Sequence, residues 1–197
     1  MRAPRILRIL RLNSCTCDSR DGRVIIYYLV DPKMKLDLWV LPATEGGEAK
    51  PLIRTEANEG AGTLSPDGRW LAYVSDVTDQ FEVYVQGFPG GGGKRQVSKG
   101  GGAYPRWGRD GRELYYYAGD GKLMAAQAPR GENFEMGAAV SLFEFRAATL
   151  LNIFASYAVT ADGQRFLIDA VVDTEPNAPL TVVASRSRRY WSGYTVN

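Results

Sequence analysis

The sequence contains no histidine, and this absence excludes Ser-His-Asp and Cys-His catalysis within the chain, as well as the commonest zinc and copper sites. Only two cysteines are present, Cys15 and Cys17, and they lie too close in sequence for an ordinary structural disulfide. No apolar run approaches the roughly 18–20 residues that a membrane-spanning helix needs, and no signal peptide is recognisable. We therefore expect no membrane span, and the cellular compartment stays open.

Excess charge of one sign is also nearly absent from the body of the chain. The formal net charge is +2, but the first 11 residues alone hold four arginines, so the remainder carries about −2. Nucleic acid is therefore not an expected partner, because nucleic-acid-binding domains gather basic residues on one face. Residues 1–14 are too short for a stable isolated helix, and we expect them to form a disordered basic extension.

What the sequence does contain is a repeat built around the dipeptide Asp-Gly. Its four copies begin at Asp21-Gly22, Asp67-Gly68, Asp110-Gly111 and Asp162-Gly163, and a further Asp-Gly, Asp120-Gly121, lies in a predicted hairpin turn within the third copy. The spacings are 46, 43 and 52 residues, and each aspartate is followed at the fourth to sixth positions by three consecutive apolar residues. These runs are Ile25–Tyr27, Leu71–Tyr73, Leu114–Tyr116 and Phe166–Ile168. Short apolar runs of this kind predict strands buried on both faces.

Further strands are predicted around each of these runs. A second strand follows at residues 37–41, 81–85, 122–126 and 180–183, so that each pair forms a hairpin. Weaker outer strands are expected near residues 50–54, 95–98 and 140–145. Leu64, Trp107 and Val159, each three residues before an aspartate, are candidate anchors of a preceding strand. Because no stretch of the repeat has helical periodicity, the sequence predicts an all-β fold of four-stranded antiparallel units.

Two features that could suggest chemistry have simpler explanations. The glycine runs at residues 90–93 and 100–102 lack the Gly-Lys-Ser/Thr ending of a phosphate-binding loop, so we interpret them as links between strands. The four aspartates each precede glycine, where aspartate caps its own backbone in a tight turn. We therefore predict no catalytic residue, no metal site and no cofactor.

The segment LSPDGRWLAY at residues 64–73 resembles the PD40 repeat of TolB-like, WD40-like β-propellers. The resemblance continues through residues 81–86, 105–111, 121–125 and 159–167, and it covers residues 18 to about 183. It is strongest to the C-terminal propeller region of TolB-type proteins or of proteins linked to bacterial serine/threonine kinases. No kinase nucleotide loop, catalytic lysine or catalytic aspartate loop is recognisable, so kinase activity is not implied.

This resemblance implies a propeller repeat domain over residues 15–185, followed by a C-terminal tail over residues 186–197. The expected blades are residues 15–55, 56–99, 100–146 and 147–185, and the first of them lacks a clear inner strand. Relatives usually carry about six or more blades, whereas four Asp-Gly motifs are visible here. We therefore expect a partial propeller.

Loops that enter the inner strands of a propeller display side chains at the mouth of its axial channel. In this chain those loops hold the candidate partner-binding residues Asn58, Glu59, Tyr104, Arg106, Ser156 and Tyr157. The alternative is that Tyr104 and Tyr157 pack between blades and that Arg106 pairs with a neighbouring acid.

Repeated blades without catalytic side chains favour a non-enzymatic interaction or sensor module that binds a protein or peptide. A first alternative is the propeller that gates a prolyl-oligopeptidase-like hydrolase, with the catalytic domain absent from this chain. A second is a fragment without an independent function, which would self-associate through open blade edges.

Overall fold

The computed structural model describes residues 14–30, 35–128, 135–147, 157–171, 181–183 and 193–195, with side chains placed at residues 19–30 and from 35 to 171 within these ranges. The described residues form strands, turns and connecting segments, and they contain no helix that could cross a membrane. The predicted all-β class is confirmed. Residues 1–13 and most of the predicted tail lie outside the described residues.

Three four-stranded antiparallel sheets follow one another along the chain. Sheet 1 contains β1 (Ser14–Asp18), β2 (Val24–Val30), β3 (Leu36–Pro42) and β4 (Lys50–Ile53). Sheet 2 contains β5 (Glu59–Leu64), β6 (Trp70–Ser75), β7 (Glu82–Gly87) and β8 (Arg95–Gln96). Sheet 3 contains β9 (Gly102–Trp107), β10 (Glu113–Ala118), β11 (Lys122–Gln127) and β12 (Ala139–Glu144). Within each sheet the strands are neighbours in chain order, which is the meander of a propeller blade.

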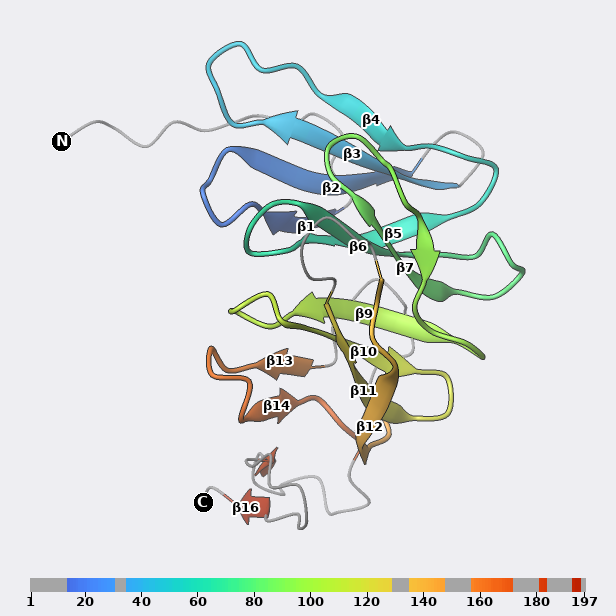
Figure 1. Ribbon diagram of the computed structural model, residues 1–197, viewed down its shortest axis with the longest axis vertical. Helices are drawn as coiled ribbons and strands as arrows, with labels where there is room; N and C mark the ends of the chain where they lie inside the picture. The colour runs from blue at the N-terminus through green and yellow to red at the C-terminus, as the bar shows by residue number, and fades with distance from the viewer. Residues whose placement is uncertain are drawn as a thin grey trace, which may run out of the picture.

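A fourth unit is represented by β13 (Tyr157–Val159) and β14 (Phe166–Ile168), which pair antiparallel. Beyond it, β15 (Thr181–Val183) is hydrogen-bonded to β16 (Gly193–Thr195) and lies next to β14. The predicted partner of β15 was β14, whereas the described hydrogen bonds join it to β16, a strand from the segment predicted as a tail. The sheets succeed one another from the top to the bottom of the view (Figure 1).

The first unit differs from its prediction because it does possess an inner strand. β1 begins at Ser14, inside the segment predicted as a disordered extension, and pairs with β2 so that Cys17 lies opposite Ile26. Its sequence, SCTCD, contains no aromatic residue and only one β-branched residue, Thr16, so pairing with its neighbour is what identifies it. The candidate anchors Leu64, Trp107 and Val159 end β5, β9 and β13, as predicted.

The hydrophobic cores lie between successive sheets. One core joins sheets 1 and 2 through Ile26, Tyr28, Leu38, Leu64, Leu71, Tyr73 and Tyr84. The next joins sheets 2 and 3 through Ala72, Val74, Val83, Val85, Trp107, Leu114 and Tyr116. The third joins sheet 3 to the fourth unit through Tyr104, Tyr115, Leu123, Tyr157, Phe166 and Ile168. Successive residues of one strand thus enter different cores, which explains the consecutive apolar residues of the repeat.

The Asp-Gly turns connect each inner strand to the next strand. Their glycines have φ values of 68°, 71°, 69° and 68°, which is the left-handed region that favours glycine. Each aspartate accepts a hydrogen bond from the backbone N–H two residues ahead, as Asp67 does from Arg69 at 3.2 Å. At Asp21 the Ser19 hydroxyl, at 2.6 Å, is the largest cause that lowers the pKa of the carboxyl. The turn interpretation of these aspartates is confirmed.

Candidate functional site

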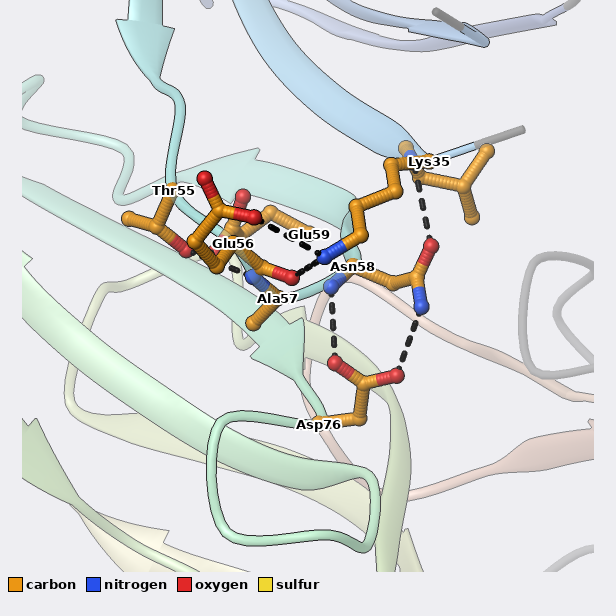
Figure 2. Close-up of polar contacts among 8 residues, drawn as sticks. Lys35, Thr55, Glu56, Ala57, Asn58, Glu59 and Asp76 are labelled. Carbon is orange, nitrogen blue, oxygen red and sulfur yellow. Dashed lines mark hydrogen bonds and ion pairs between the residues drawn. The ribbon is translucent and has the colours of Figure 1, made fainter. Parts of the chain in front are cut away.

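Asn58, the first predicted site residue, clamps sheets 1 and 2 together (Figure 2). Its backbone N–H and its Nδ2 each donate to the Asp76 carboxylate, to Oδ1 and Oδ2 respectively, at 2.7 Å. Its Oδ1 accepts the backbone N–H of Leu36 in sheet 1 at 3.1 Å. Beside it, the Lys35 ammonium contacts the backbone oxygen and the carboxylate of Glu56. Both polar atoms of the Asn58 side-chain amide are therefore hydrogen-bonded within the chain.

Replacing Asn58 with alanine is expected to lower the free energy of unfolding by about 1.5–3 kcal/mol, because the half-buried Asp76 carboxylate loses one donor and the Leu36 amide loses its acceptor. Asn58→Asp is the matched variant, since it keeps the shape but faces Asp76 with a second carboxylate, and it is expected to cost more. Urea denaturation measures both. If Asn58→Ala unfolds at the same urea concentration as the wild type, the clamp contributes nothing.

Glu59 lies at the start of β5 and is 1% exposed. Its Oε1 accepts a hydrogen bond from the Thr55 hydroxyl at 2.5 Å, whereas Oε2 is buried without a hydrogen-bond partner among the described residues. Burial has the largest effect on this carboxyl and raises its pKa. The negative charge of Asp37 also raises the pKa, whereas the hydrogen bond from Thr55 lowers it. A partner cannot reach Glu59 without separating the first two sheets.

Tyr104 and Tyr157 pack between sheet 3 and the fourth unit. Each is 3% exposed, and the Tyr157 hydroxyl donates to the backbone oxygen of Tyr104 at 2.7 Å. Burial raises the pKa of Tyr157. This arrangement matches the alternative interpretation, in which both tyrosines join blades. Ser156 lies outside the described residues.

Among the predicted site residues within the described ranges, Arg106 alone has an exposed side chain. It stands near the end of β9 and lines a cavity of about 260 Å³ together with residues of β5 and β13. The described residues include no acid paired with it, so the expected ion pair with a neighbouring acid is not found among them.

A larger cleft, of about 670 Å³, lies among the Asp-Gly turns of sheets 1 to 3. These turns join β1 to β2, β5 to β6 and β9 to β10, on the left-hand side of the view (Figure 1). The charged residues that line the cleft are Arg20, Asp67, Arg69, Arg109, Asp110 and Arg112. The Arg20 guanidinium donates to the backbone oxygen of Arg109 at 3.4 Å, which ties the first turn to the third.

The charges in this arginine-lined cleft do not balance. Arg69 pairs with Asp67 at 2.7 Å, and Arg112 lies 3.7 Å from Asp110. Arg20 and Arg109 are then in excess, so the cleft carries a surplus of about two positive charges. A concave site with surplus arginines can bind carboxylates or other anions through paired N–H donors.

The sequence held a signal for this cleft. The tetrapeptide Arg-Asp-Gly-Arg occurs twice, at residues 20–23 and 109–112. The predicted site residues belong to the chain that enters or forms the inner strands, whereas these arginines lie in the turns that follow those strands. Within the described ranges no group of three or more aspartate, glutamate, cysteine or histidine residues could hold a metal ion.

Comparison with known proteins supports the fold at low sequence identity. No family model and no curated protein sequence matches the chain. Among solved structures, TolB from Acinetobacter baumannii matches with a TM-score of 0.60 and 16% identity, over 90% of this chain and 42% of TolB. The β-propeller domain of Cps50 (Swd1) from Myceliophteria thermophila matches with a TM-score of 0.59 and 14% identity, over 88% of this chain and 55% of that domain.

A puromycin-hydrolysing peptidase from Mycobacterium tuberculosis also matches, with a TM-score of 0.53 and 20% identity, over 85% of this chain and 33% of the peptidase. The chain thus spans between about a third and just over half of the length of these three proteins. The antiparallel four-stranded sheets, their order and these matches agree on one architecture. This chain has the fold of TolB-type and WD40-like β-propeller blades and corresponds to part of such a propeller.

Proposed function

We propose that this chain is part of a β-propeller that acts as a non-catalytic binding module, and that its arginine-lined cleft takes an acidic segment of a protein partner. The surplus of positive charge in a cleft of about 670 Å³ carries this proposal. Volumes of this order are typical of sites that enclose a ligand. Arginine suits the task because its planar fork of N–H donors matches a carboxylate and remains charged at every physiological pH.

The position of the surplus arginines supports binding across blades. Arg20 belongs to sheet 1 and Arg109 to sheet 3, and the turn of sheet 2 with Pro66 lies in the same cleft. An extended acidic segment in the cleft would contact the turns of all three sheets. Such complementarity of charge speeds the encounter of two proteins and selects against basic partners.

The direct test is the binding of a fluorescein-labelled oligoglutamate peptide, followed by fluorescence anisotropy at low and at physiological ionic strength. The double variant Arg20→Glu/Arg109→Glu is expected to weaken binding by about tenfold or more, because it replaces the surplus cations with anions. Lys50→Glu is the single-site control, since Lys50 is exposed on β4, outside the cleft. Raising the ionic strength should weaken binding to the wild type.

Equal binding by the double variant and by Lys50→Glu would refute the proposal. An oligolysine peptide of the same length supplies the second check, since it should not bind to the wild type. Circular dichroism of each variant tests that the sheets are retained.

A second candidate function draws on the match to the puromycin-hydrolysing peptidase, which extends well beyond the part that this chain covers. In that function the blades stand beside a separate catalytic domain, and the cleft faces its substrate. A Gly-x-Ser-x-Gly motif and a histidine in sequence adjoining this chain would favour it over the binding module.

A further inference from the structure

A smaller cavity, of about 260 Å³, lies where three inner strands end. Six of its lining residues are Thr63, Leu64, Arg106, Trp107, Ala158 and Val159. They are the last two residues of β5, β9 and β13, so three units contribute equivalent positions. Because the inner strand of each blade lies nearest the axis of a propeller, this axial cavity belongs to the central channel.

Most of the residues that line the axial cavity are apolar, and one of them, Arg106, is charged. Leu64, Trp107 and Val159 form apolar parts of the wall, and the Trp107 Nε1 donates to the backbone oxygen of Thr63 at 3.1 Å. That hydrogen bond satisfies the indole and joins β9 to β5. Arg106 is exposed, lies near enough to the Tyr157 hydroxyl to affect its pKa, and forms no ion pair or hydrogen bond with any described residue.

The axial cavity lies next to the arginine-lined cleft. Pro66 lines both of them, and it also lines a third hollow of about 200 Å³ beside Arg20. A ligand held by the surplus arginines of the cleft can therefore extend past Pro66 towards Arg106.

We infer that the axial cavity binds the carboxyl terminus of the acidic segment, with the terminal carboxylate on Arg106 and an apolar last side chain against Leu64, Trp107 and Val159. This inference rests on the proposed function. One cation beside several apolar side chains matches a chain end, which offers one carboxylate and one side chain.

The test compares three peptides of glutamates ending in leucine, by the same anisotropy measurement. The first has a free carboxyl terminus, the second is identical but amidated, and the third is amidated and carries one extra internal glutamate, so that its net charge equals that of the first. The wild type is expected to bind the free acid about tenfold more tightly than either amide. The variant Arg106→Gln should bind all three peptides about equally, at the strength of the amides.

Each result separates this inference from the proposed function. Equal binding of the free acid and the charge-matched amide to the wild type overturns the inference and leaves the acidic cleft standing. A preference for the free acid that persists in Arg106→Gln also overturns it. If no glutamate peptide binds to the wild type, both the proposed function and the inference fail. Because Arg106 is exposed, thermal unfolding of Arg106→Gln should match the wild type.

Discussion

Replacing Tyr115 with alanine is expected to lower the free energy of unfolding by about 3–5 kcal/mol, as for other large aromatic side chains removed from a core. Tyr115 on β10 is 1% exposed, and its ring meets Phe166 of the fourth unit edge to face, with 5.3 Å between the ring centroids. The substitution leaves a cavity between sheet 3 and β14. Chemical denaturation followed by circular dichroism measures the loss.

Tyr115→Phe is the matched control because it keeps the ring and removes only the hydroxyl, which donates to the Glu113 carboxylate at 2.7 Å. Its expected cost is about 1.5–3 kcal/mol, the range for a hydrogen bond to a charged group. If the alanine and phenylalanine variants lose the same free energy, the ring does not contribute to the contact between the third and fourth units.

Glu59→Gln is expected to remove a decline in stability towards alkaline pH. The pKa of Glu59 is raised in the folded state, so the folded protein holds this proton more tightly than the unfolded chain. The resulting stabilisation is fully present below the unfolded pKa and is lost as the pH rises through the folded pKa. Each unit by which the pKa is raised corresponds to about 1.4 kcal/mol. Glutamine cannot ionise, so its variant lacks this dependence.

The measurement is the difference in free energy of unfolding between wild type and Glu59→Gln, from urea denaturation across the pH range from acid to weakly alkaline. Taking this difference cancels the contribution of the turn aspartates, such as Asp21 and Asp162, which are present in both proteins. Their lowered pKa values make stability fall, rather than rise, as the pH becomes acid. A difference that does not change with pH would contradict a raised pKa of Glu59 in the folded state.

Much of the fold could be predicted because the relevant signals are local. An Asp-Gly turn needs only neighbouring residues, and a strand buried on both faces shows itself in consecutive apolar residues. β2, β6, β10 and β14 were found in this way. β1 was missed because SCTCD has no such signal, and its strand conformation depends on hydrogen bonds to β2.

The candidate site could be predicted much less well, for a related reason. Sequence position suggested that Asn58 and Glu59 stand at a channel mouth, but Asn58 is hydrogen-bonded between sheets 1 and 2 and Glu59 is buried. Arg20 and Arg109 were not predicted as site residues, because each has the sequence context of an ordinary turn residue. They are 89 positions apart, and only the stacking of three sheets brings the side chain of one to the backbone of the other.

The sequence by itself therefore determined the repeat, the turn chemistry of its aspartates and the all-β class, because each follows from residues close together in the chain. The tertiary structure decided which polar residues are buried or hydrogen-bonded between blades and which are exposed in a cleft or cavity. Burial, hydrogen-bond partners and the meeting of like charges depend on contacts between sheets. Those contacts distinguish Glu59, enclosed between two blades, from Arg106 and the surplus arginines of the cleft.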